Sequence, residues 1–131
     1  MSWLLLDYGQ VLSLPQSAAD RHLLQEAAGR PSPDFWVAYW RHRPNYDRGT
    51  ITAEEYWTAV LERRPAGPAL DRLIKRDVAG WLRPNRDTLD ATTRAAQRGL
   101  RLAILSNAPH EVADAVDRAD WLSGFTRRVF S

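Results

Sequence analysis

The sequence predicts an α/β protein: a partial doubly wound parallel sheet with a helical lobe inserted after the first strand. Two short apolar runs, at residues 3–6 and 100–105, have the length and composition of strands. The second run lies between two stretches with helical spacing, and a long aromatic-rich helical stretch separates it from the first run. Alternation of strands and helices in this order is typical of parallel α/β sheets.

The first predicted strand covers residues 3–6 and ends at Asp7. Its four residues, Trp-Leu-Leu-Leu, are all apolar, without the alternation of a strand that has one wet face. An unbroken apolar run indicates a strand covered on both faces, as in the middle of a parallel sheet. We therefore expect Asp7 to follow a buried strand.

The second half of the chain predicts helix, strand, helix and strand in succession. A helix is expected from about Asn85 to Arg98, and Gly99 is well placed to end it before the strand at 100–105. Pro109 suits the first turn of the next helix. The segment from Phe125 to Ser131 then resembles the start of a third strand.

The segment between the two strong strands predicts four helices. Ser17 suits an N-cap, Pro33 and Pro68 suit first turns, and Thr52 begins the capping box Thr-Ala-Glu-Glu. Turns are expected at 29–31, 43–45 and 64–68, each of which contains proline. We expect a lobe at 13–83, with Trp36, Trp40, Tyr56 and Trp57 in its core or at its seam with the sheet, and an α/β core at 1–12 and 84–131.

Composition excludes several classes of function. The chain of 131 residues has no cysteine, which rules out disulfides, thiolate nucleophiles and cysteine-bound zinc. The net charge is only +2, and acidic residues are scattered among the arginines, so no nucleic-acid partner is predicted. No apolar run reaches the roughly 18 residues of a membrane span, and no secretory leader is evident. These features predict a cytoplasmic protein without a membrane partner.

Polar residues follow both strong strands, where α/β sheets bind their ligands. Asp7 could attack phosphorus or carbon as a carboxylate, and Gly9 could bring a backbone carbonyl close to a metal. Ser106 and Asn107 offer a hydroxyl and an amide, and the helix after Pro109 adds an N-terminus suited to anions. Alternatively, Asp7 is a turn residue and Ser106 and Asn107 only cap the helix.

Two motifs carry a resemblance to a known family. The first is Leu-Leu-Leu-Asp-Tyr-Gly-Gln-Val-Leu at 4–12, and the second is Leu-Ala-Ile-Leu-Ser-Asn-Ala-Pro at 102–109. Together with Tyr-Asp-Arg-Gly-Thr-Ile at 46–51 in the helical insert, they resemble the haloacid-dehalogenase-like (HAD) hydrolases, in the subfamily with a D-x-G-x-V motif and a helical cap. The similarity extends over essentially the whole chain.

The resemblance implies a magnesium-dependent hydrolase that cleaves phosphoesters of small metabolites. By this resemblance, Asp7 is the nucleophile and a ligand of Mg²⁺, and Gly9 gives Mg²⁺ its backbone carbonyl. Ser106 and Asn107 would bind the phosphoryl group.

The first departure from the family pattern concerns proton transfer. Phosphatases of this family usually carry a second Asp two residues after the nucleophile, and here that position is Gly9. Proton transfer would then come from water or from a residue of the insert such as His42, although a histidine between two arginines is more often merely exposed. The absence of the second Asp is also compatible with dehalogenation, in which Asp7 attacks carbon.

The second departure is that the chain stops at Ser131, before the Lys-Pro and acidic motifs of the family. The only lysine, Lys75, falls in the insert, so the sequence predicts no cation facing Asp7. We therefore expect this chain to have little or no activity and to bind Mg²⁺ weakly. A non-catalytic interaction module is the third alternative, and an unpaired strand edge near Val129 gives a physical reason for a homodimer.

Overall fold

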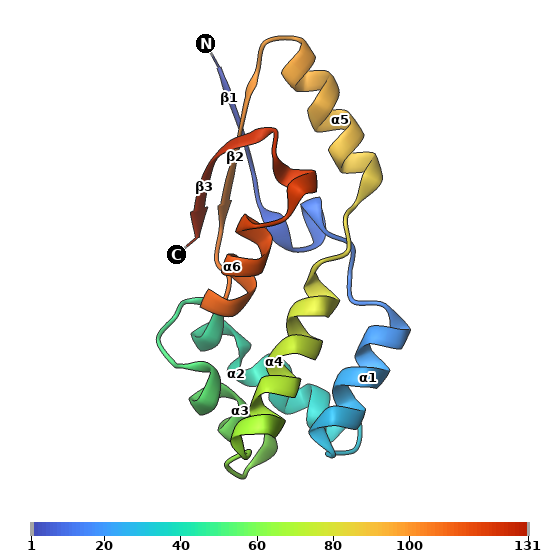
Figure 1. Cartoon of the computed structure of the whole chain (residues 1–131), viewed down its shortest axis with the longest axis vertical. Coiled ribbons are helices and arrows are strands. Elements are labelled where there is room, and N and C mark those ends of the chain that lie inside the picture. The colour runs from blue at the N-terminus through green and yellow to red at the C-terminus, as the bar shows by residue number, and fades with distance from the viewer. Residues whose placement is uncertain (1, 131) are drawn as a thin grey trace.

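A parallel three-stranded sheet forms the upper half of the computed structural model, which describes residues 2–130 (Figure 1). The strands β1 (Trp3–Leu6), β2 (Arg101–Ser106) and β3 (Phe125–Phe130) lie side by side in that order. Leu6 is paired with Ile104, so the first two strands end at the same edge of the sheet. All three carboxyl ends point toward a helical lobe. The predicted strands and their parallel pairing are confirmed.

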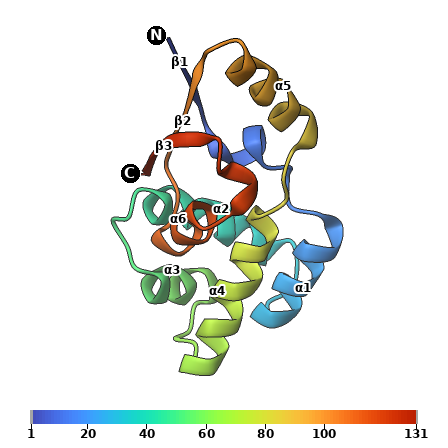
Figure 2. The same cartoon turned by 45° about the horizontal axis from the view of Figure 1, so that its top comes forward.

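The lobe consists of two pairs of helices (Figure 2). The helix α1 (Ala18–Ala28) lies beside α4 (Gly67–Trp81), and α2 (Asp34–Asp47) lies beside α3 (Ala53–Leu61). Ser17 caps α1, and Thr52 with Glu55 forms the predicted capping box of α3. The N-cap preferences of short polar side chains therefore located these helix starts correctly.

The predicted turn at 43–45 is wrong, because α2 continues through Pro44 to Asp47. Proline removes one helical hydrogen bond and normally ends a helix. Here the residues on either side of it are held by burial: Arg43 and Tyr46 are both almost fully inaccessible. Tertiary packing of this turn outweighs the local preference of proline.

Aromatic side chains fill the core of the lobe. Phe35, Tyr39, Tyr56 and Trp57 are completely buried, and the rings of Tyr46 and Tyr56 stack at 4.3 Å. The prediction that Tyr56 and Trp57 lie in this core is confirmed. Trp36, which is partly buried, packs against the same core. Trp40 instead is 45% exposed, with its ring edge-on to that of Trp81, so it lies at the periphery.

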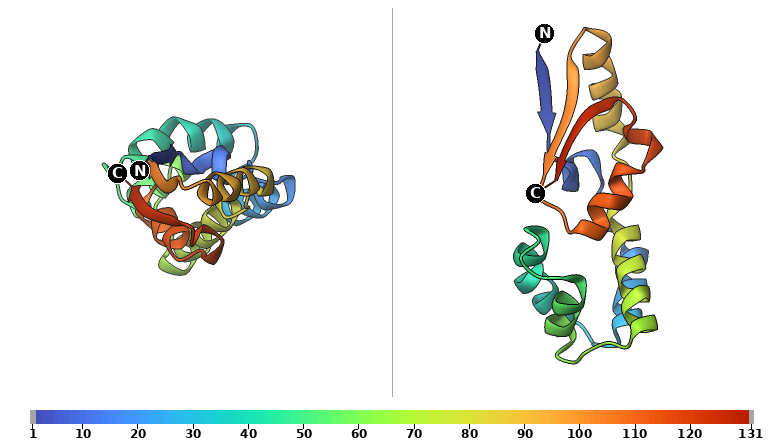
Figure 3. Two further views of the ribbon diagram at one scale, coloured as in Figure 1. Left: turned by 90° about the horizontal axis from the view of Figure 1, so that it is seen from above. Right: turned by 60° about the vertical axis from the view of Figure 1, so that its left-hand side comes forward.

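Only one face of the sheet is covered by helices (Figure 3). The helices α5 (Arg86–Gln97) and α6 (His110–Asp117) lie on the same side, because the strand order does not reverse and successive right-handed crossovers fall on one face. A doubly wound sheet would have helices on both faces, and the described residues do not supply the second layer. The open face exposes four large apolar side chains, those of Trp3, Leu5, Leu105 and Val129.

The open face also corrects the prediction of a buried first strand. Leu5 is 62% exposed and Trp3 is 40% exposed, whereas Leu4 and Leu6 pack against the sheet-side core. β1 is an edge strand with one wet face, so its unbroken apolar run does not reflect burial on both sides. Asp7, which follows it, is exposed.

A narrow connection joins the lobe to the sheet. Ser13 and Pro84 form an isolated antiparallel bridge, the Leu14 amide donates to the Arg83 carbonyl at 2.7 Å, and the Asn85 amide donates to the Leu12 carbonyl at 2.8 Å. The apolar side chains of the lobe and of the sheet form two separate clusters on either side of this connection. The predicted boundaries at 12/13 and 83/84 lie within it.

None of the helices in residues 2–130 has both the length and the apolar character that crossing a bilayer requires.

Candidate active site

The ends of β1 and β2 bring the two predicted polar residues into direct contact. Asp7 follows β1 and Ser106 ends β2, in neighbouring parallel strands. The Ser106 hydroxyl donates a hydrogen bond of 2.6 Å to Oδ1 of Asp7, across 99 residues of sequence. The prediction that these side chains share one site at the carboxyl edge of the sheet is confirmed.

Asp7 is held by its own backbone turn as well as by Ser106. The Tyr8 amide donates to Oδ1 of Asp7 at 2.7 Å, so this single oxygen accepts two hydrogen bonds. Both bonds fix the orientation of this carboxyl group. Within residues 2–130 these bonds engage Oδ1, which leaves Oδ2 as the oxygen better suited to attack a substrate.

The turn after Asp7 spans η1 (Tyr8–Leu12) and is closed by a hydrogen bond of 3.1 Å from the Ser13 amide to the Tyr8 carbonyl, although Gly9 and Gln10 have non-helical backbone angles. Gln10, not Gly9, has the left-handed backbone, with φ of 60°, whereas φ of Gly9 is −61°. Gly9 therefore lines the site without using the left-handed backbone that glycine allows.

A pocket of about 240 Å³ opens at this edge of the sheet. Its walls come from the sheet loops on one side and from the helical lobe on the other. The lining residues are Asp7, Tyr8, Gly9, Gln10, Arg43, Asp47, Trp81, Ser106, Asn107, Ala108, Pro109 and Val112. Asn107 is exposed there, and the N-terminal end of α6 opens on the same space.

Arg43 and Asp47 are the main residues of the pocket that sequence reasoning missed. Arg43 is 3% exposed, and its guanidinium lies 5.0 to 5.6 Å from the ring centres of four aromatic residues, Tyr39, Tyr46, Tyr56 and Trp81. Arg43 thus lines the same pocket as Asp7, and its ion pairs are with Asp47 and Asp77. The available signal was the spacing Tyr39, Arg43, Asp47, which places all three on one helical face. Reading 43–45 as a turn concealed it.

Arg43 is paired with two carboxylates. Its Nη1 donates to Asp77 at 2.7 Å and to the Tyr39 hydroxyl at 2.9 Å, and its Nε donates to Asp47 at 3.1 Å. Tyr39 in turn donates to Asp77 at 2.5 Å. Burial opposes the charge of Arg43, but Asp77 foremost, then the tyrosines and Asp47, outweigh it and hold the pKa of Arg43 well above its ordinary value.

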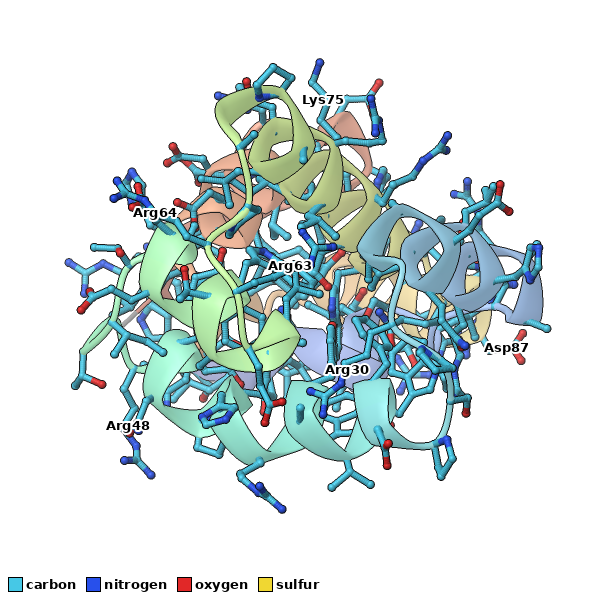
Figure 4. All side chains as sticks on the ribbon, turned by 90° about the horizontal axis from the view of Figure 1, so that it is seen from below. Arg30, Arg48, Arg63, Arg64, Lys75 and Asp87 are labelled. Carbon is cyan, nitrogen blue, oxygen red and sulfur yellow. The ribbon has the colours of Figure 1, made fainter. Side chains whose placement is uncertain are left out.

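His42 and Lys75 do not reach the pocket. His42 is partly buried on α2 but is not among the pocket-lining residues. Lys75 is exposed on α4 and projects outward from the lobe (Figure 4). The weak expectation that His42 transfers protons therefore gains no support, and Lys75 cannot neutralise Asp7.

The residues of the pocket offer Mg²⁺ only part of a site. Mg²⁺ prefers six oxygen ligands in near-octahedral geometry and is usually held by one or two carboxylates together with waters and substrate phosphates. Across the described range 2–130, no three His, Cys, Asp or Glu side chains gather as a metal cluster. Asp7 and the Gly9 carbonyl are the predicted ligands, and the nearby carboxylate of Asp47 is already paired with Arg43. These groups do not make a complete magnesium site.

Comparison of the chain with models of protein families, with curated proteins and with solved structures found no match.

Proposed function

We propose that this protein is a phosphoester hydrolase of the HAD type, in which Asp7 attacks phosphorus and forms an aspartyl-phosphate. The observation that carries this proposal is the hydrogen bond of 2.6 Å between Ser106 and Asp7, at the mouth of a pocket formed by two neighbouring strand ends. A carboxylate fixed in this way is suited to nucleophilic catalysis.

The groups around Asp7 suit a phosphoryl substrate. The hydroxyl of Ser106, the amide of Asn107 and the N-terminus of α6 are hydrogen-bond donors at the pocket. Arg43 also lines the pocket, but its charge is offset by Asp77 and Asp47. Donors that face an oxyanion stabilise the charge that develops as phosphorus is attacked. A pocket of about 240 Å³ fits a small phosphorylated metabolite better than a polymer.

The reaction would proceed in two halves. Oδ2 of Asp7 attacks phosphorus, the bond from phosphorus to the ester oxygen breaks, and that oxygen takes up a proton and leaves as the alcohol; the water that attacks in the second half gives back one proton. Water then attacks the same phosphorus, releases inorganic phosphate and restores the carboxylate of Asp7. The covalent intermediate divides one difficult hydrolysis into two easier steps.

The test is to detect phosphorus on Asp7 itself. The protein is incubated with 4-nitrophenyl phosphate and Mg²⁺, any acyl phosphate is reduced with borohydride, and the N-terminal peptide is examined by mass spectrometry. We expect modification at position 7 in the wild-type protein and none in Asp7→Asn. Asp20→Asn, which changes an acidic residue in the first turn of α1, serves as the matched control and should label like the wild type.

Hydrolysis at carbon is the second candidate, because the pocket has no second carboxylate two residues after Asp7 and a halide leaving group needs no proton. A parallel incubation with short 2-haloacids distinguishes the two reactions. Asp7-dependent release of halide, without labelling by the aryl phosphate, would replace the phosphatase proposal. Failure of both substrate classes to react at Asp7 would favour a non-catalytic interaction module.

A further inference from the structure

The pocket contains few groups that could give a proton to a leaving alcohol. Arg43 stays protonated at all ordinary pH values, and burial raises the pKa of the Tyr8 hydroxyl. Asp7 is committed to the attack on phosphorus. Of the described residues that line the pocket, Asp47 carries the one remaining carboxyl group.

Asp47 is the last residue of α2 and lines the pocket from the lobe. Its side chain is 34% exposed, so it can exchange protons with water. The hydrogen bond from Arg43 Nε ends on Oδ1 at 3.1 Å. No other hydrogen bond to Asp47 occurs within residues 2–130, and Oδ2 is therefore the oxygen suited to carry and donate a proton.

Two carboxyl groups compete for the single guanidinium of Arg43, and Asp77 is the better paired of the two. Asp77 accepts hydrogen bonds of 2.5 Å from Tyr39 and 2.7 Å from Arg43, and both its partners are buried. Asp47 has only the longer bond of 3.1 Å. Asp47 therefore has the weaker of the two pairings with Arg43.

The surroundings of Asp47 raise its pKa. Burial disfavours the carboxylate, Arg43 opposes this effect through charge and through its hydrogen bond, and the negative charge of Asp77 adds to the increase. The other carboxyl group that lines the pocket is that of Asp7. A raised carboxyl pKa is the property that a general acid needs near neutral pH.

We infer that Asp47 is the general acid and base of this site, supplied by the helical lobe where Gly9 offers no carboxyl group; the inference rests on the proposed phosphoester hydrolysis. As Asp7 attacks and the bond from phosphorus to the ester oxygen breaks, the proton of Asp47 passes to that oxygen and a neutral alcohol departs. Asp47, now a carboxylate, takes a proton from the water that attacks the aspartyl-phosphate. Phosphate leaves, and both carboxyl groups return to their starting states.

The arrangement makes Arg43 a positioning residue. Its buried guanidinium is fixed by Asp77 and by four aromatic rings, and its Nε in turn fixes Asp47. The general acid therefore depends on the folded core of the lobe.

The experiment compares two leaving groups in single-turnover release, with protein in excess. 4-Nitrophenolate is a stable anion and leaves without a proton, whereas the alcohol of a primary alkyl phosphate needs one. We expect Asp47→Asn to slow release of the alcohol by about 10²–10⁴-fold, the usual contribution of general acid catalysis, and to slow release of nitrophenolate by less than about tenfold. Asp34→Asn, an exposed change at the other end of α2, should affect neither.

The pH profile supplies a second measurement. Release of the alcohol by the wild-type protein should fall as pH rises through the pKa of Asp47, and this limb should be absent in Asp47→Asn. The role of Asp47 would be overturned if Asp47→Asn slowed release from both substrates equally. It would also be overturned if the pH profile for the alkyl phosphate kept its falling limb in Asp47→Asn. Either result would leave Asp7 in place as the nucleophile. Absence of Asp7-dependent release from either substrate would overturn the proposed hydrolysis itself, and this inference with it.

Discussion

Removing the charge of Asp77 should expose how strongly the lobe depends on its buried ion pair. The side chains of Arg43 and Asp77 are only 4% and 2% exposed, and 2.7 Å separates their paired atoms. Asp77→Asn keeps the shape of the side chain and an oxygen that can accept from Tyr39. It removes the negative charge opposite Arg43 and puts an NH₂ group in place of the oxygen that accepts a hydrogen bond from Arg43.

Breaking one partner of a buried pair typically costs about 3–5 kcal/mol, because the remaining charge stays buried without compensation. Arg43 would keep Asp47 at 3.1 Å and its aromatic neighbours, so we expect a loss near the lower end, about 3 kcal/mol. With a slope of about 1.5 kcal/mol per M of urea, this loss lowers the midpoint of unfolding by roughly 2 M. Tryptophan fluorescence and circular dichroism should report the same transition.

Two further variants sharpen this measurement. Asp71→Asn changes an exposed acid on the same helix and should stay within about 0.5 kcal/mol of the wild type. The double change of Arg43→Met with Asp77→Leu removes both charges, and it should be less destabilising than Asp77→Asn alone. If Asp77→Asn unfolds within about 1 kcal/mol of the wild type, the ion pair is not the anchor of the lobe and the reasoning fails.

Three other predictions concern the contact between the lobe and α6, the pH dependence of stability and the open face of the sheet. Tyr46→Phe removes the bond of 2.7 Å that Tyr46 donates to Glu111 on α6, and it should cost about 1–2 kcal/mol in urea unfolding, with no further loss from Glu111→Gln in the same protein. Because the pKa of Asp47 is raised in the folded state, the stability due to its protonated form is present at low pH and is lost as pH rises above about 3.8. Between pH 4 and pH 7 the wild type should therefore lose stability relative to Asp47→Asn. A difference in the free energy of unfolding that stays constant over this range would contradict the prediction. Val129, on the edge strand β3, is 52% exposed, and we expect sedimentation to show a concentration-dependent dimer that Val129→Glu weakens; a monomer at every concentration would contradict it.

The sequence was sufficient for the elements and for the pairing of their ends. Asp7 and Ser106 each follow an apolar run, and parallel strands must end at a common edge, so local pattern and topology together predicted their contact. The N-cap roles of Ser17 and Thr52 could also be predicted from the sequence, because an N-cap contacts residues only two or three positions away. These features are local, or follow from a simple rule of connection.

The features that sequence reasoning missed depend on tertiary packing. Pro44 looks like a helix break until the burial of Arg43 and Tyr46 holds the helix together across it. The pairing of Arg43 with Asp77 joins positions 34 residues apart, and no periodicity predicts it. Likewise, the apolar run of β1 does not reveal that Leu5 faces outward, because an uncovered apolar face and a buried one have the same composition.

The oxygen ligands available around Asp7 are too few to bind Mg²⁺ tightly. One carboxylate and the carbonyl of Gly9 replace few of the waters that Mg²⁺ gives up reluctantly, and Arg43 competes for the other carboxylate of the pocket, Asp47. We therefore expect titration calorimetry to show no saturable binding of Mg²⁺ by this chain up to millimolar concentrations. Asp47→Asn should leave this result unchanged, because Asp47 is engaged with Arg43. Stoichiometric binding that disappears in Asp7→Asn would refute the argument, since Asp7 would then anchor a metal site that its described neighbours do not account for.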